Sequence, residues 1–116
     1  TFFTNPHGLS DPKNRSTSND MINLAYHCMK QNERFSAIVQ TKFYESKIFN
    51  KNTKMMRLEK WMNSNLSLFD NDGLCYGIKT GNTPNAGPCL ASYFKTENIE
   101  VTIILLSSET KEDRFK

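Results

Sequence analysis

The chain has 116 residues, a length that suits one small domain and is too short for two. Hydrophobic residues make up 37% of the sequence and charged residues 23%, as in an ordinary globular protein. No apolar run is long enough to cross a bilayer, so we expect no membrane-spanning segment in this chain. Nothing in the composition indicates a cofactor.

The formal net charge of +3 is mild, but basic residues alternate with aromatic ones between Lys42 and Lys60. Such interleaving can mark a nucleic-acid-binding surface. Glu45 and Glu59 interrupt the run, however, and no known nucleic-acid-binding motif accompanies it. A solvated face is therefore the favoured interpretation, and we expect no nucleic-acid partner. The opposite interpretation would require salt-sensitive binding through this stretch.

The N-terminal part predicts a loop followed by a helix. Residues 4–13 are rich in Asn, Pro, Gly, Ser and Asp, which favours a loop, and a lone His7 in it is expected to be structural. Thr17 then fits the N-cap of a helix, with Asp20 reaching back as in a capping box. Apolar residues recur at i, i+3, i+4 and i+7, which predicts one buried stripe made of Met21, Leu24, Ala25 and Cys28.

The middle of the chain is less regular. Arg34 to Gln40 predicts a second short helix, and Thr41 to Phe49 alternates imperfectly, as in a strand or hairpin arm. The Asn- and Lys-rich composition of residues 50–65 predicts exposed connections. The scattered apolar residues in that segment are expected to belong to the core: Met55, Met56, Leu58, Trp61 and Met62.

A strand is expected before the most distinctive tripeptide of the chain, Lys79-Thr80-Gly81. Asp70-Asn71-Asp72-Gly73 predicts a tight turn, and the apolar run from Leu74 to Ile78 leads from it into the tripeptide. A loop rich in Gly and Pro follows, from Gly81 to Gly87. The Lys-Thr-Gly triad is therefore predicted at a strand end, where it would be exposed.

Two more strands are predicted, at Cys89 to Lys95 and at Ile99 to Leu106, with a tight turn between them. Three consecutive strands joined by short loops indicate an antiparallel meander. A helix is expected from Ser108, because Glu109 and Glu112 would complement the positive end of its dipole.

The three cysteines, Cys28, Cys75 and Cys89, form an odd set without Cys-x-x-Cys spacing. Free thiols are therefore expected, with neither a disulfide framework nor a metal site. A cysteine nucleophile paired with His7 or His27 is disfavoured, because the sequence places no histidine beside either strand cysteine.

Lys79-Thr80-Gly81 is a motif shared by serine penicillin-binding proteins and class A β-lactamases. On its own it is a weak signal. Its continuation to Leu90, Lys-Thr-Gly-x-Thr-x-x-Ala-Gly-x-Cys-Leu, resembles the low-molecular-mass D-alanyl-D-alanine carboxypeptidases, penicillin-binding serine peptidases of family S11. Residues 5–9, Asn-Pro-His-Gly-Leu, resemble a loop of the same family. The family's Asn-x-Asn-x-Leu-Leu segment is matched loosely by Asn63, Asn65 and Leu68.

The resemblance implies an α+β fold of the β-lactamase/transpeptidase type, an antiparallel sheet flanked by helices. In that family the motifs Ser-x-x-Lys and Ser-x-Asn precede the Asn-Pro-His-Gly-Leu loop, and we identify neither here. Residues 1–116 are therefore expected to be the C-terminal part of a single catalytic domain. Ser108 and Lys111 have the first spacing, but they follow the Lys-Thr-Gly triad, which is the wrong order.

The implied activity is removal of the terminal D-Ala from peptidoglycan stem peptides through an acyl-enzyme. Stem peptides ending in D-Ala-D-Ala and β-lactam antibiotics are the implied partners, and an extracytoplasmic location, periplasmic or secreted, is implied as well. The alternative is a non-catalytic module, similar to penicillin-binding proteins, that binds cell-wall peptide. Residues upstream of this chain would separate the two.

The resemblance also assigns roles within the strand. Lys79 would be catalytic and would attract the substrate carboxylate, and the Asn82 N–H would be one of two oxyanion donors. Thr80 and Thr83 would bind substrate, and Gly81 would let it approach the backbone.

Two positions depart from the family pattern. The family commonly has an aromatic residue or His at position 82, and a small or acidic residue where this chain has Tyr76. Either departure could alter substrate fit, although a backbone oxyanion donor at Asn82 need not abolish activity.

Overall fold

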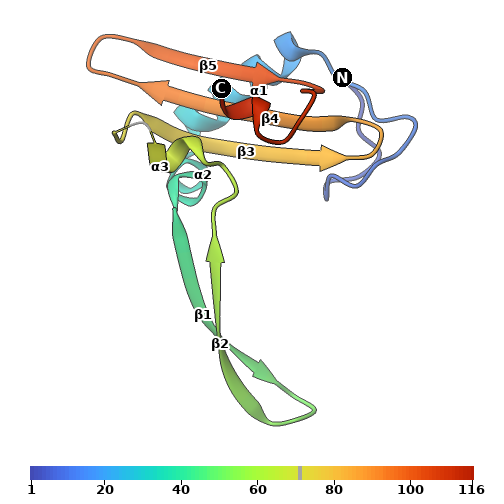
Figure 1. The fold of residues 1–116 in the computed structure, drawn as a ribbon, viewed down its shortest axis with the longest axis vertical. Helices are drawn as coiled ribbons and strands as arrows, with labels where there is room; N and C mark the ends of the chain where they lie inside the picture. The colour runs from blue at the N-terminus through green and yellow to red at the C-terminus, as the bar shows by residue number, and fades with distance from the viewer. Residues whose placement is uncertain (71) are drawn as a thin grey trace.

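A computed structural model describes residues 1–70 and 72–116, so Asn71 of the predicted turn lies outside the described residues. The chain forms a three-stranded antiparallel sheet with helices against it and a two-stranded hairpin that projects away from it (Figure 1). The predicted α+β class is confirmed. In chain order the elements are α1 (Ser18–Gln31), α2 (Glu33–Gln40), β1 (Phe43–Asn50), β2 (Met55–Met62), α3 (Ser67–Asp70), β3 (Cys75–Thr83), β4 (Gly87–Lys95), β5 (Glu100–Leu105) and a 3-10 turn (Asp113–Phe115).

The sheet is the predicted antiparallel meander, in the order β3-β4-β5. The Lys-Thr-Gly triad lies within β3 and not at its end, because β4 continues to pair with β3 as far as Thr83, opposite Gly87. Directly paired residues share a face of the sheet. Ile78 and Thr80 are opposite Ser92 and Leu90, whereas Lys79 is opposite Ala91 on the other face.

Helix α1 begins at Ser18 and has the predicted N-cap, Thr17, whose hydroxyl accepts a hydrogen bond from the Asp20 N–H at 3.1 Å. The Asp20 carboxylate is turned toward the Thr1 ammonium, 3.0 Å away, so only the Thr17 half of the capping box is confirmed. The predicted stripe needs a correction, because Leu24 is 52% exposed. Ala25 and Met29, one turn apart, face the sheet. Leu24 therefore lies on the flank of the helix.

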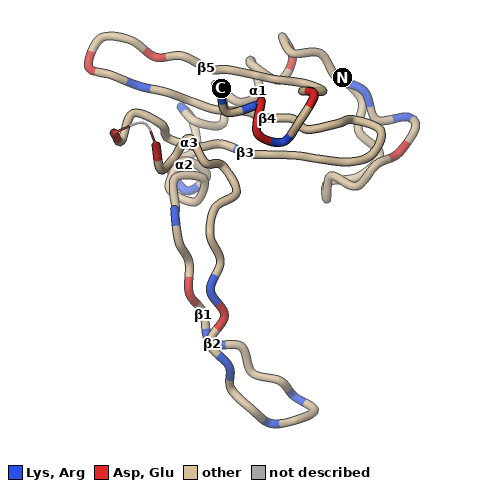
Figure 2. The backbone as a smooth tube through the Cα atoms, viewed as in Figure 1, with Lys and Arg blue, Asp and Glu red and all other residues tan. Residues whose placement is uncertain are grey.

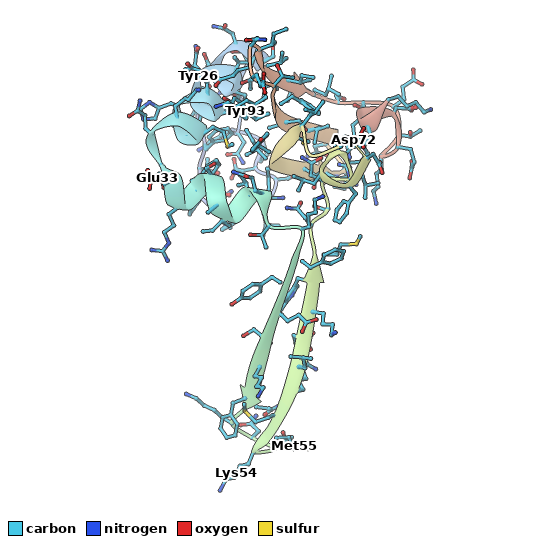
Figure 3. The ribbon with its side chains drawn as sticks, turned by 90° about the vertical axis from the view of Figure 1, so that its left-hand side faces the viewer. Tyr26, Glu33, Lys54, Met55, Asp72 and Tyr93 are labelled. Atoms are coloured by element: carbon cyan, nitrogen blue, oxygen red, sulfur yellow. The ribbon has the colours of Figure 1, made fainter. Side chains whose placement is uncertain are left out.

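A small core lies between the two long helices and the sheet. Its buried members are Ala25, Met29, Ile78 and Tyr93, and Figure 3 shows Tyr93 between α1 and the strands. Helix α2 approaches β3 closely at Gly77, which has a φ of +121° and where a Cβ would lie 2.8 Å from Val39 Cγ2. This contact fixes the start of β3 against the helix layer.

The projecting hairpin, β1 and β2, is called the arm below. Its first strand was predicted, but the prediction of exposed connections for residues 50–65 is wrong, because residues 55–62 pair along their whole length with β1. The chain reverses where the Asn50 side chain accepts the N–H groups of Asn52 and Thr53, and Lys54 takes a φ of +53°.

The apolar residues of β2 are not in the core, contrary to the prediction. All five are exposed, from 45% at Trp61 to 67% at Met55. Lys54 and Met55 lie at the far end of the arm, well away from the sheet (Figure 3).

The helix predicted from Ser108 is also wrong. Ser107 has a φ of +58°, which is not a helical conformation. The Ser108 N–H donates to the Pro88 carbonyl at 2.9 Å, so the chain still runs beside β4 at this point. Thr110 then caps the short 3-10 turn by accepting from the Asp113 N–H at 3.1 Å. None of the described helices is long and apolar enough to cross a membrane.

Candidate active site

A groove of about 910 Å³ joins two segments that are far apart in the sequence. One wall is the second half of β3, Lys79 to Thr83, and the other is the N-terminal loop that includes residues 5–9. The loop lies beside the end of the sheet where β3 turns into β4 (Figure 1). Two of the three segments that carried the family resemblance therefore meet in one site.

The loop is held by its own side chains. The Asn5 side chain accepts from the Gly8 N–H at 3.0 Å and donates to the Leu9 carbonyl at 3.1 Å. The His7 Nδ1 accepts from the Leu9 N–H at 3.2 Å, so this nitrogen is already engaged and is not a free base. This bond holds His7 within the turn, and the structural role expected for it stays a prediction.

Two cationic side chains border the strand wall of the groove. Lys79 is exposed, and its ammonium donates to the Thr80 carbonyl. Arg114 Nη1 donates to the carbonyls of Gly81 (3.1 Å) and Cys89 (3.3 Å), while its buried Nε has no hydrogen-bond partner among the described residues. Sequence reasoning missed Arg114, because no local motif marks a residue that reaches β3 from beyond β5.

Thr80 and Gly81 have different surroundings. Thr80 is 7% exposed, and its hydroxyl lies 2.6 Å from the Ser64 hydroxyl. At Gly81 an added Cβ would meet only the Cys89 Cβ, at an ordinary 3.9 Å. The packing of the described residues therefore does not require glycine at position 81.

The N–H of Asn82 points to the open edge of the sheet. Pro88, its partner on β4, has no N–H, and the Pro88 carbonyl accepts from Ser108 on the β5 side. In an antiparallel ladder such a pair is non-hydrogen-bonded, so the Asn82 backbone faces away from β4. Because β3 is an edge strand of the sheet that the described residues form, this N–H is directed away from β4, to the open side of that sheet. Thr83 follows on the groove wall and is half-buried.

Tyr76 packs against the core cluster between the helices and the sheet. It does not line the groove in the described part of the chain. Its departure from the family pattern therefore does not crowd this site.

Two further tetrads with the Ser-x-x-Lys spacing start at Ser10 and at Ser92. The motif needs a helix to bring serine and lysine onto one face. Ser10 lies in the N-terminal loop, Ser92 is buried within β4, and Ser108 precedes the 3-10 turn. None of these three serines has a helix-borne lysine beside it.

The three cysteines are free, as expected. Burial raises the pKa of the Cys75 thiol, which donates to the Gly77 carbonyl at 3.3 Å. Such a thiol is a poor nucleophile. Among the described residues, no group of three His, Cys, Asp or Glu side chains could hold a metal ion.

Solved structures with a similar fold include a DD-transpeptidase, a point mutant of it and a penicillin-binding protein. The Streptomyces K15 DD-transpeptidase is 31% identical with a TM-score of 0.81, over 92% of this chain and 40% of that one. A point mutant of it gives a TM-score of 0.85 at 30% identity, over 99% and 45%. Penicillin-Binding Protein D2 from Listeria monocytogenes, in its cefotaxime-bound form, has a TM-score of 0.77 at 22% identity, over 99% and 43%, and shows similarity of fold only.

The family model of D-alanyl-D-alanine carboxypeptidase, peptidase S11, matches residues 1–110. D-alanyl-D-alanine carboxypeptidase DacA from Haemophilus influenzae is 33% identical over 98 residues, which cover 84% of this chain and 22% of that protein. The chain belongs to the D-alanyl-D-alanine carboxypeptidase family, as its motifs predicted. It spans about a fifth of the length of that relative.

Proposed function

We propose that residues 1–116 are the C-terminal part of the catalytic domain of a serine-type D-alanyl-D-alanine carboxypeptidase. The observation that carries the proposal is the groove, where the Lys-Thr-Gly strand, the Asn-Pro-His-Gly-Leu loop and Arg114 come together. The nucleophilic serine and its lysine would come from another part of the protein. Residues 1–116 alone are therefore expected to be inactive.

The cations of the groove support recognition of a carboxylate. Lys79 supplies a compact charge and Arg114 a planar guanidinium, and both suit the terminal carboxylate of a D-Ala-D-Ala peptide or a β-lactam. Thr80 would add a hydroxyl. The space at Gly81 would admit the substrate next to the strand, and Thr83 would line its far end.

The free edge of β3 supports a role in acyl transfer. A stem peptide lying along this edge would add as a strand and pair with the backbone of β3. Its scissile carbonyl would then approach the Asn82 N–H, which would stabilise the negative charge that develops when a serine attacks. The second oxyanion donor would belong to the nucleophile's own backbone.

An enzyme with these substrates acts on the cell wall, so the proposal includes an extracytoplasmic location, periplasmic or secreted. The alternative is a non-catalytic module that binds cell-wall peptide.

Incubation of the full-length protein with a fluorescent penicillin and with a D-Ala-D-Ala peptide tests the proposal. We expect release of D-Ala and a covalent adduct on a serine outside residues 1–116, with no adduct on the isolated chain. An adduct mapped by mass spectrometry to Ser10 or Ser108 would overturn the assignment of the nucleophile. Binding of peptide without adduct or release would favour the non-catalytic module.

A further inference from the structure

The Lys-Thr-Gly strand is tied to a serine that no motif singles out. The Ser64 hydroxyl lies 2.6 Å from the Thr80 hydroxyl and joins the segment before α3 to the middle of β3. Thr80 is 7% exposed, so water has little access to its hydroxyl, whereas Ser64 itself is exposed. The orientation of the Thr80 hydroxyl therefore depends on Ser64.

The residue before Ser64 anchors it to the helix layer. The Asn63 side chain donates to the carbonyls of Val39 (3.2 Å) and Thr41 (3.1 Å) at the end of α2. Its Oδ1 also accepts from the Asn65 N–H at 2.9 Å, which closes a turn around Ser64.

The residue after Ser64 anchors it to the sheet. Asn65 is fully buried, at 0% exposed, and its side chain donates to the Ser92 hydroxyl of β4 at 3.3 Å. Its Oδ1 accepts from the Ser67 N–H at 3.2 Å. Ser64 is exposed itself but stands between two fixed asparagines, so its position relative to β3 is set by the fold.

A hydroxyl group has one proton to donate and two lone pairs that can accept. If Thr80 donates its proton to a substrate carboxylate, its oxygen remains free to accept the proton of Ser64. Ser64 would then hold the Thr80 hydroxyl in the donating orientation and strengthen its bond, since hydrogen bonds in a chain polarise one another. Without Ser64, the Thr80 hydroxyl could rotate toward other acceptors, such as nearby backbone carbonyls.

We propose that Ser64 is a positioning residue for recognition of the substrate's terminal carboxylate and acts through Thr80. The inference rests on the proposed function, because it assigns a role within the same site. The Ser64–Thr80 bond could instead serve only to join two parts of the fold, and the experiment must separate these roles.

Two substrates distinguish a positioning role of Ser64 from a purely structural one. They are a D-Ala-D-Ala peptide with a free carboxylate and the same peptide ending in a carboxamide. In the full-length protein, we expect Ser64→Ala to lower kcat/KM for the free acid about threefold to tenfold relative to the amide, the size of one net hydrogen bond. Ser64→Thr, which keeps the hydroxyl, should retain the ratio. Ser46→Ala on the arm is the matched control and should leave both values unchanged.

Thr80→Val provides a second route to the same answer, because it keeps the shape and removes the hydroxyl. We expect it to lower the acid-to-amide ratio by a similar factor, and Ser64→Ala added to it should cause no further loss. An equal loss on both substrates in Ser64→Ala would show that the bond is purely structural and would overturn the inference. An unchanged acid-to-amide ratio of kcat/KM in Ser64→Ala or in Thr80→Val would also overturn it. If the wild-type protein processes neither substrate, the proposed function itself fails and the inference falls with it.

Discussion

The described residues form two antiparallel sheets whose strands have similar lengths but different surroundings. The β3-β4-β5 sheet is covered by α1 and α2, and its strands carry the buried residues Ile78, Leu90 and Tyr93. The arm has no cover among the described residues, and both strands are exposed along nearly their whole length. Strand pairing alone therefore does not make a site. The groove forms only where paired strands are packed against other elements.

The register of the arm shows why it has no buried face. The pair Phe49–Met56 shares one face with Lys47–Leu58, and the pair Ile48–Arg57 lies on the other, so apolar and basic residues occur on both faces. Six basic and two acidic residues lie between positions 42 and 60, and Figure 2 shows this charge along the arm.

Local contacts hold the arm together. The rings of Tyr44 and Trp61 pair across the strands with centroids 5.8 Å apart, and Lys60 pairs with Glu45 at 2.7 Å. At the base, Phe43 contacts Phe69 of α3, with ring centroids 5.5 Å apart. Such cross-strand pairs contribute modestly, so a two-stranded hairpin without cover is marginal by itself.

The largest expected effect is on stability, from one leucine in each sheet. Leu90→Ala in β4 removes a side chain that is 5% exposed and should lower the free energy of unfolding by about 2–5 kcal/mol. Leu58→Ala on the arm, where the side chain is 53% exposed, should change it by no more than about 0.5 kcal/mol. Urea unfolding of the two variants measures both values. Equal losses would mean that another part of the protein covers the arm.

The next comparison uses one lysine from each sheet and measures activity. In the full-length protein, Lys79→Ala should lower the rate of acylation by penicillin on the order of 10²-fold, by analogy with loss of a transition-state contact. Lys79 is exposed on the groove wall, so the protein should stay folded. Lys47→Ala on the arm is the control and should acylate like wild type. A folded Lys79→Ala protein with wild-type kinetics would exclude Lys79 from the site.

The contrast between the sheets also explains which strands could be predicted from the sequence. The strands of the β3-β4-β5 sheet were predictable, because apolar runs alternate there with strong turn signals. Strand β2 was not, because Met-Met-Arg-Leu-Glu-Lys-Trp-Met has no alternation and pairs as a strand only through its register with β1. The propensity of such a segment depends on its cross-strand neighbours, which the local sequence does not show.

The same limit applies to the site. The Lys-Thr-Gly triad and the Asn-Pro-His-Gly-Leu loop could be found from the sequence, because their residues are contiguous. Arg114 and Ser64 could not, because each reaches β3 from a distant segment through a single side-chain contact. The burial of Thr80 follows from the same tertiary contacts.

A pair of glycines in β3 separates stability from ligand binding. Gly77→Ala should cost about 1–3 kcal/mol of stability, because its φ of +121° disfavours a side chain and the new Cβ would clash with Val39. Adding Val39→Ala to Gly77→Ala should restore only part of the lost stability, because it relieves the clash but leaves the unfavourable φ at position 77 unchanged. Gly81→Ala has room for its Cβ and should leave stability within about 0.5 kcal/mol of wild type while weakening penicillin acylation. Equal unfolding midpoints for the two alanine variants would contradict this distinction.

The smallest expected effect concerns the ion pair that ties α1 to β5. The Lys30 ammonium lies 2.5 Å from the Glu100 carboxylate, and together with a hydrogen bond from Tyr93 it lowers the pKa of Glu100 from 4.5 to about 2. A carboxyl with a depressed folded-state pKa binds fewer protons folded than unfolded, so its contribution is present above pH 4.5 and is lost as the pH falls toward 2. Glu100→Gln should therefore flatten the decline in stability over this range, by a modest amount because the pair is solvent-accessible. Lys30→Met should flatten it only in part, because Lys95 still lies 3.4 Å from the Glu100 carboxylate. The double variant should match Glu100→Gln alone, because that substitution already removes the titrating carboxylate. Thermal melts between pH 2 and 7 measure these slopes, and an additive effect in the double variant would show that the two residues act separately.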